Sequence, residues 1–281
     1  MVIINRVNEI RKKVREWKSK GLRVGFVPTM GYLHEGHESL IKKASEENDK
    51  VVVSIFVNPI QFGPKEDLSA YPRDLERDSA ICERAGADVI FHPKNDEMYE
   101  NDFSTFVDMT GLTKELCGKS RPIHFRGVCT VVNKLFNIVC PDRAYFGQKD
   151  AQQLAIIKKM VRDLSFDVEI IGCPIVREED GLAKSSRNAY LSNEEREVAT
   201  ILNKSLMKAR KLIEGGERSS KLIINSIIQT INSEPMARVD YVNVVDSLSI
   251  EPVENIESSV LIAIAVYIGK TRLIDNFTYE L

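Results

Sequence analysis

The sequence has few of the features that mark secreted, membrane-spanning or nucleic-acid-binding proteins. Its five cysteines are scattered and form no CxxC pair, which argues against a disulfide framework or a zinc site and for reduced thiols in a cytoplasm. The longest apolar run, Val260–Gly269, is shorter than the roughly 20 residues of a transmembrane helix. The N-terminus has no apolar segment typical of a secretory signal. Lys and Arg nearly balance Asp and Glu, to a net charge of −2, so we expect no nucleic-acid or membrane partner.

The first part of the chain alternates strand and helix patterns. With 281 residues and 43% hydrophobic composition, the chain can form one large or two moderate domains. Val51–Val57 is β-branched on both faces, which is typical of a strand covered by helices on both sides. Strands are predicted at 23–28, 51–57, 87–91, 144–147 and 166–172, and helices at 37–48, 73–85, 128–140 and 150–164. This alternation predicts βαβ units and a mostly parallel sheet.

The pattern changes after about residue 190. Asn193–Glu214 is predicted to be one long helix, with Ser192 as its N-cap and Glu195 in the capping-box position. A second helix, Lys221–Asn232, is followed by closely spaced strands at 238–246, 260–269 and 271–281. The sequence therefore predicts an α/β protein with a smaller α+β domain at its C-terminal end.

The stretch PTMGYLHEGH places two histidines between a glycine-rich turn and a helix. It follows a predicted strand, and ligands bind at the carboxyl ends of strands in open α/β sheets. The first backbone N–H groups of a helix lack internal partners, and the helix dipole favours an anion there, usually a phosphate. His34 and His37 can donate hydrogen bonds to phosphate oxygens. The alternative is that these imidazoles only cap the helix.

Three further segments carry polar groups at predicted strand ends or in loops. GLAKSSRNAYL, residues 181–191, gathers Lys184, Ser185, Ser186 and Arg187, a set that could close over a triphosphate or could simply be a solvated linker. FGQKDAQQL, residues 146–154, offers a lysine for phosphate and Gln153 for a second substrate. FVNPIQFGP, residues 56–64, offers Gln61, an amide that can hold a small hydroxy acid without adding negative charge beside a nucleotide.

A fourth segment, RPIHFRGV, leaves its role open. Arg121, His124 and Arg126 precede the apolar helix predicted at 128–140. They either line the mouth of the ligand cleft or orient that helix.

Taken together and in order, these segments resemble one family. PTMGYLHEGH, FVNPIQFGP, YPRDLERD, RPIHFRGV, FGQKDAQQL, REEDGLAKSSRNAYLS and VDYVNVVD are similar to the pantothenate synthetases, in the HxGH nucleotidylyl-transferase superfamily. The resemblance implies a Rossmann-like ATP- and pantoate-binding domain, 1–180, and an α+β lid domain, 181–281. It also implies a cytoplasmic homodimer that condenses ATP-activated pantoate with β-alanine in the coenzyme A pathway. Pantoyl adenylate would be the intermediate, with release of pyrophosphate and AMP.

The resemblance also implies roles for individual positions. Catalytic roles fall on His34, His37, Lys149 and Arg187, with His37 as the proton donor; Gln61 and Gln153 bind pantoate, and Gln61 also binds β-alanine. The ATP-binding positions are Met30, Gly31, Tyr32, Leu33, His34, Glu35, Gly36, His37, Gly147, Gln148, Lys149, Asp150, Val176, Lys184, Ser185, Ser186 and Arg187. No residue is expected to be a dedicated metal ligand, because Mg²⁺ is held mainly through the ATP phosphates.

One position departs from the family pattern, and two other functions compete. The family is expected to have methionine where this chain has Lys184, and a cation there could tighten triphosphate binding. An adenylyltransferase acting on a phosphorylated cofactor precursor would share HxGH but would need extra Arg or Lys for the second phosphate. A module that only senses ATP would need no acid pocket. The glutamines at 61 and 153 favour a carboxylic acid substrate.

Overall fold

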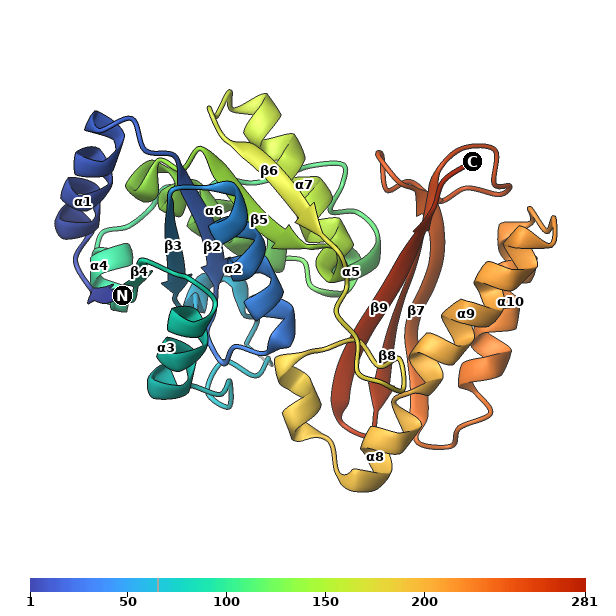
Figure 1. Ribbon diagram of the computed structural model, residues 1–281. Coiled ribbons are helices and arrows are strands. Elements are labelled where there is room, and N and C mark those ends of the chain that lie inside the picture. Colours follow the sequence, from blue (N-terminus) through green and yellow to red (C-terminus); the bar gives the residue numbers. More distant parts are fainter. Residues whose placement is uncertain (65) are drawn as a thin grey trace. The chain divides into compact units, whose positions relative to one another are not determined.

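The structure is a computed structural model that describes residues 1–64 and 66–281. The chain divides into two compact units (Figure 1). Unit 1 comprises Met1–Thr113, Gly118–Gln148 and Gln153–Pro174, and unit 2 comprises Lys114–Cys117, Lys149–Gln152 and Ile175–Leu281. The functional domains predicted at 1–180 and 181–281 stay a prediction.

Unit 1 is built on a parallel sheet. Within the described residues it has six strands, all paired in parallel. In spatial order they are β1 (Val2–Ile4), β4 (Val89–Phe91), β3 (Lys50–Ile55), β2 (Val24–Thr29), β5 (Arg143–Gly147) and β6 (Glu169–Cys173). The predicted α/β class with a mostly parallel sheet is therefore confirmed.

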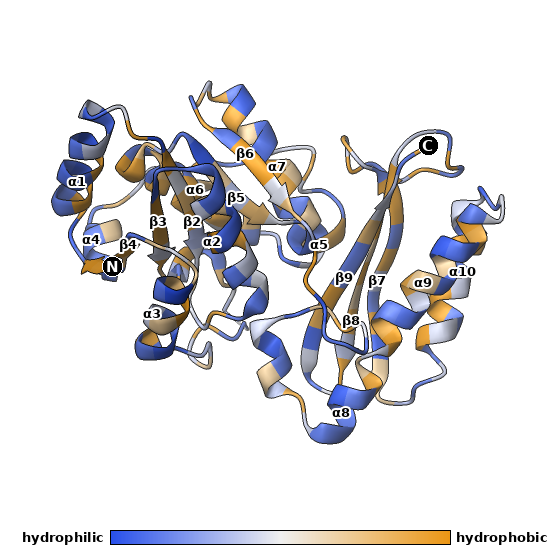
Figure 2. Cartoon of the chain, viewed as in Figure 1, coloured by the Kyte–Doolittle hydropathy of each residue, from blue (hydrophilic) through white to orange (hydrophobic). Residues whose placement is uncertain are grey.

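Helices cover both faces of this sheet, as the β-branched strands predict. Alternate residues of a strand point to opposite faces. In β2, Phe26 packs edge to face against Phe136 of α6 (His124–Val139), while Val27 joins the core beneath α2 (Glu35–Glu47) and α3 (Leu75–Arg84). The remaining helices are α1 (Val7–Ser19), α4 (Asn95–Met98), α5 (Leu116–Ser120) and α7 (Ala151–Asp163). In Figure 2 the strands are mostly hydrophobic and the outer helix surfaces mostly hydrophilic.

Unit 2 contains a small antiparallel sheet covered by two helices. Its strand order is β7 (Ala237–Asp246), β8 (Val260–Ile268) and β9 (Thr271–Tyr279). Apolar side chains of this sheet share one core with α9 (Ile201–Glu214) and α10 (Ser220–Ile231). None of the helices in the described part of the chain is long and apolar enough to cross a bilayer.

The prediction of one helix over Asn193–Glu214 is wrong. The segment forms α8 (Asn193–Val198) and α9, interrupted at Ala199 and Thr200. There the backbone N–H of Thr200 donates to the carbonyl of Glu197, and its hydroxyl donates to the same carbonyl at 2.8 Å. The Thr200 N–H thus bonds to the carbonyl three residues back instead of four, which interrupts the regular α-helical ladder. The predicted capping box is confirmed, because Glu195 N donates to Ser192 Oγ and Ser192 N donates to Glu195 Oε2.

Candidate active site

Three of the predicted segments follow neighbouring strands of the parallel sheet. β2 pairs with β3 on one side and with β5 on the other. PTMG follows β2, FVNPIQ follows β3, and FGQK spans the end of β5. From β2 the chain continues outward to β3 and β4, and from β5 it continues outward on the other side to β6. The strand order therefore reverses between β2 and β5, and α/β sheets bind ligands at the carboxyl ends of the strands at such a topological switch point.

The two histidines cap helix α2 at this edge. His34 is the N-cap, and its Nδ1 accepts from the backbone N–H of Gly36 at 3.1 Å. His37 Nδ1 accepts from the backbone N–H of His34 at 3.3 Å. The two rings lie with their centroids 4.1 Å apart. These are the two reciprocal bonds of a capping box, formed by imidazoles in place of Ser and Glu.

Capping fixes which ring nitrogen carries the proton. A nitrogen that accepts a hydrogen bond must have a lone pair, so both neutral rings carry their proton on Nε2. This tautomer follows from the hydrogen-bond network. Each ring can therefore cap the helix through Nδ1 and donate from Nε2–H to an anion at the same time. The capping and phosphate-binding interpretations, which the sequence left as alternatives, are compatible.

A buried carboxylate holds the loop that leads into the histidines. Asp78 of α3 is 1% exposed. Its two oxygens accept from the backbone N–H groups of Tyr32, at 2.8 Å, and Leu33, at 2.6 Å. Burial raises the pKa of Asp78 above its usual range, against the opposing effect of these two bonds. Sequence reasoning missed this residue, although a carboxylate in register with the buried Ile81 and Cys82 on one helix face was a visible signal.

The loop itself has left-handed backbone at two positions. Gly31 has φ +86° and Tyr32 has φ +49°. A Cβ at Gly31 would lie 3.0 Å from both Asp78 Oδ2 and Ile55 Cγ2. Glycine is therefore required at position 31 for its backbone conformation and for the close approach of the carboxylate.

A cavity of about 430 Å³ lies behind this loop, within unit 1. Met30, Gly31 and Asp78 form part of its wall, together with side chains from the ends of β3 and β4. Gly31 is in close contact with Ile55 and Asp78 on this wall, and the two Asp78 bonds hold the next two residues of the loop.

Gln61 is held in place by its own neighbours. It ends the short 3₁₀ helix η1 (Pro59–Gln61) and is 7% exposed. Its Oε1 accepts from Asn58 Nδ2 at 2.9 Å, and its Nε2 lies 3.0 Å from Met30 Sδ. A Cβ on Gly127 of α6 would lie 2.4 Å from Gln61 Cα, so only glycine lets α6 approach this turn. The structure therefore brings Met30 and Gln61 together, as the proposed shared site requires.

The RPIHFRGV residues orient the same turn and helix. Arg121 donates to both oxygens of Glu66, at 2.8 and 2.6 Å. Burial acts to raise the pKa of Glu66, but the Arg121 guanidinium outweighs it and the pKa lies below its usual range. His124 Nδ1 lies 3.1 Å from the Gln61 carbonyl oxygen, and Arg126 stacks 4.0 Å from the Phe106 ring centroid. These contacts tie the segment to the turn after β3 and to Phe106, and a role at the mouth of the cleft stays a prediction beside them.

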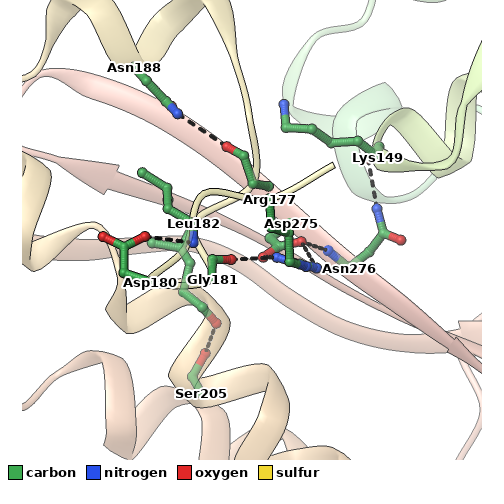
Figure 3. Close-up of polar contacts among 11 residues, drawn as sticks. Lys149, Arg177, Asp180, Gly181, Leu182, Asn188, Ser205, Asp275 and Asn276 are labelled. Carbon is green, nitrogen blue, oxygen red and sulfur yellow. Dashed lines mark hydrogen bonds and ion pairs between the residues drawn. The ribbon is translucent and has the colours of Figure 1, made fainter. Parts of the chain in front are cut away.

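The predicted positions around β5 continue into α7. Gly147 ends β5, and Gln148–Asp150 forms the 3₁₀ helix η2 before α7 begins at Ala151. Gly147, Gln148 and Gln153 belong to unit 1, whereas Lys149 and Asp150 belong to unit 2. In unit 2 the Lys149 carbonyl accepts from Asn276 Nδ2 of β9 at 2.7 Å (Figure 3).

The remaining predicted ATP positions lie in one folded loop of unit 2. The Lys184 N–H donates to the Val176 carbonyl at 2.9 Å, and Arg177 and Ala183 form an antiparallel bridge. Arg177 anchors this loop to β9, since its guanidinium donates to both oxygens of Asp275, at 2.7 and 2.9 Å, and to the Gly181 carbonyl (Figure 3). Ser185 caps the 3₁₀ turn η3 (Ser186–Tyr190) by accepting from Arg187 N. Val176 and Lys184 are thus brought together by the backbone.

Lys184 lies in an ion pair that the sequence did not predict. Its Nζ is 2.6 Å from Glu178 Oε2, and both side chains are partly buried. Replacing Lys184 with methionine would leave this carboxylate without its cation in a loop proposed to meet triphosphate. We therefore predict that Lys184→Met weakens ATP binding and that adding Glu178→Gln restores it. Isothermal titration with a non-hydrolysable ATP analogue checks this, and equal affinities in all three proteins would contradict it.

No group of three or more His, Cys, Asp or Glu suited to a metal ion occurs in residues 1–64 and 66–281. The cysteines are free thiols. Burial raises the pKa of Cys82 and Cys129 to about 12, so these two thiols stay protonated and act as core residues.

Comparisons with known proteins identify the family of this chain. The family model for pantoate-beta-alanine ligase matches residues 2–278. The chain belongs to the pantoate–β-alanine ligase family. Its relatives include proteins named pantothenate synthetase from Enterococcus faecalis, 68% identical, and from Clostridium botulinum strain Loch Maree, 62% identical, each over the full length of both chains.

Solved structures of the pantoate–β-alanine ligase family share the fold. The pantothenate synthetase from Thermus thermophilus is 46% identical, with a TM-score of 0.93 over 99% of both chains. The pantoate-beta-alanine ligase from Francisella tularensis, described as complexed with beta-gamma ATP and beta-alanine, is 36% identical, with a TM-score of 0.79 over 99% of this chain and 97% of that one.

Proposed function

We propose that this chain is a ligase that uses ATP to join pantoate to β-alanine by an amide bond. Family membership supports this activity, because the family match covers nearly the whole chain. The observation that supports the chemistry is the pair of capping imidazoles at the β2–α2 junction, because a ring that accepts through Nδ1 carries its proton on Nε2 and can donate it to a phosphate at the helix N-terminus.

The reaction proceeds in two steps. The pantoate carboxylate attacks the α-phosphorus of ATP and forms pantoyl adenylate, with pyrophosphate as the leaving group. The β-alanine amine then attacks the acyl carbon and AMP leaves. A carboxylate is a poor electrophile, so adenylation supplies the leaving group, and the protein contributes positioning and charge stabilisation without a covalent intermediate.

The individual roles are part of the proposal. His34 and His37 donate to the phosphates, with His37 as the proton donor, and Lys149 and Arg187 add positive charge. Gln61 and Gln153 hold pantoate, and Gln61 also meets β-alanine. The clustering of Met30 with Gln61, and of Val176 with Lys184, supports a shared set of contacts in each unit. The full ATP set comprises 30–37, 147–150, 176 and 184–187.

Mg²⁺, compartment and assembly complete the proposal. Mg²⁺ enters with ATP and is held mainly through its phosphates, where it offsets negative charge. We place the enzyme in the cytoplasm, which the free thiols support. A homodimer is proposed from the family resemblance, and light scattering in solution tests it.

The test of the function is isotope exchange between pyrophosphate and ATP. We expect exchange that depends on pantoate and not on other small hydroxy acids, with pantothenate formed once β-alanine is added. An adenylyltransferase acting on a phosphorylated precursor would show no dependence on pantoate, and a module that only binds ATP would show no exchange.

A further inference from the structure

We propose that Asp78 is a positioning residue for the adenylation step, acting through the backbone of the loop that presents the two histidines. This inference rests on the proposed function. Asp78 lies on α3, outside every segment proposed to bind a substrate, and is 1% exposed. Its two carboxylate oxygens are engaged by the backbone N–H groups of Tyr32 and Leu33, one oxygen to each.

The placement of these two bonds determines what they can control. Leu33 directly precedes His34, the N-cap of α2. The clamp formed by Asp78, Tyr32 and Leu33 therefore fixes the chain one residue before the first imidazole. A donor must lie within a few tenths of an ångström of its acceptor position to stabilise developing charge. The backbone of Tyr32, at φ +49°, is held in a conformation that a non-glycine residue adopts at a cost.

The surroundings show why the loop needs this clamp. The cavity behind the loop has Met30, Gly31 and Asp78 in its wall. Without the carboxylate, the loop has empty volume to relax into, and the strained backbone favours that relaxation. The histidines would still cap α2 through their Nδ1 atoms, so the helix would persist while its position relative to the substrates changed.

The decisive variant is Asp78→Asn, which keeps the shape of the side chain. An amide can accept from one of the two N–H groups but presents its own N–H to the other, so one bond is lost. We expect pantoate-dependent ATP–pyrophosphate exchange to fall by about 100-fold, the effect of a misplacement of about 1 Å near reacting groups. The fall should appear in kcat/KM for ATP.

A second readout separates positioning from general damage. Supplied with pantoyl adenylate and β-alanine, the Asp78→Asn protein should form pantothenate at the wild-type rate, because the β- and γ-phosphates have already left. A purely structural role would lower both steps together. Loss of both steps in Asp78→Asn, or full exchange in that variant, would overturn the proposal. Absence of pantoate-dependent exchange in the wild-type protein would instead overturn the proposed function.

Asp74→Ala is the matched control. Asp74 caps the same helix, where its Oδ1 accepts from Arg77 N at 3.0 Å, so this bond stabilises α3 itself and not the histidine loop. This variant should lower the melting temperature and keep the exchange rate. If Asp74→Ala lost exchange as strongly as Asp78→Asn, the stability of α3 would explain both losses, and the proposed role of the Asp78 bonds would be contradicted.

Gly31→Ala perturbs the clamp without changing Asp78; because Gly31 is itself among the proposed ATP positions, the decisive outcome of this variant is the negative one. The added methyl would lie 3.0 Å from Asp78 Oδ2 in a left-handed backbone position. We expect the same selective loss of the adenylation step. Wild-type exchange in Gly31→Ala would contradict the proposal.

Discussion

Replacing His37 with asparagine should abolish most of the adenylation activity while the protein stays folded. The asparagine side-chain oxygen can take the place of Nδ1 and accept from the His34 N–H, so the cap survives. It has no group at the position of Nε2–H, so the donor to the phosphates is lost. Removing one such donor costs about 100- to 1,000-fold in kcat. Pantoate-dependent ATP–pyrophosphate exchange and thermal melting, measured on the same preparation, check both halves of this prediction.

His34→Asn is the companion variant. Asparagine is among the best N-cap residues, so the melting temperature should be kept or raised while exchange falls. His37→Gln, which places an amide N–H near the position of Nε2, should retain more exchange than His37→Asn. Wild-type exchange in His37→Asn would remove the imidazole from the mechanism. Unfolding of both asparagine variants would show that the side-chain amide oxygen does not replace Nδ1 as the capping acceptor.

The largest loss of stability should follow from replacing Arg177 with methionine. Asp275 is 1% exposed and accepts two bonds from Arg177 and one from the Asn276 N–H. Without the guanidinium, a carboxylate is left uncompensated beneath the loop of residues 176–184. Breaking one partner of a buried pair costs about 3–5 kcal/mol. Because Arg177 keeps 28% of its side-chain surface exposed, we expect the lower end, about 3 kcal/mol, in urea unfolding.

Arg196→Met provides the matched comparison. Arg196 makes the same two-bond contact to Asp180, at 2.8 and 3.1 Å, but on the surface, with 30% and 45% of the two side chains exposed. An exposed pair contributes about 0–1 kcal/mol. Equal losses in the two variants would show that burial does not determine the strength of the Arg177–Asp275 pair.

The sequence predicted the fold well where burial alone decides the pattern. The β-branched run at 51–57 became β3, because a strand covered by helices on both faces must be apolar on both, and the apolar segment at 260–269 became the buried central strand β8. Helix α1, which the pattern analysis did not assign, buries Ile10, Val14 and Trp17 at helical spacing. The split between α8 and α9 lies at Ala199 and Thr200, where the Thr200 N–H bonds to the carbonyl three residues back, and residue patterns do not specify such a local change of hydrogen bonding.

The candidate site was predictable as a set of segments but not as a set of contacts. HEGH indicated a phosphate site, yet the assignment of its Nδ1 atoms to capping required the geometry of α2. Asp78 and Gly127 act through the close approach of backbone segments that lie far apart in the chain, and Glu178 pairs with Lys184 across a folded loop. Such contacts arise from tertiary packing, so no local pattern in the sequence predicts them.

A crystal structure with pantoate and a non-hydrolysable ATP analogue tests the central claim most directly. The claim is that both imidazoles cap α2 through Nδ1 and donate from Nε2 to the nucleotide. We predict phosphate oxygens about 2.7–3.2 Å from both Nε2 atoms, with the Gly36 and His34 N–H bonds to Nδ1 preserved. Phosphates bound away from the β2–α2 junction, or rings flipped so that Nδ1 faces the ligand, would contradict it.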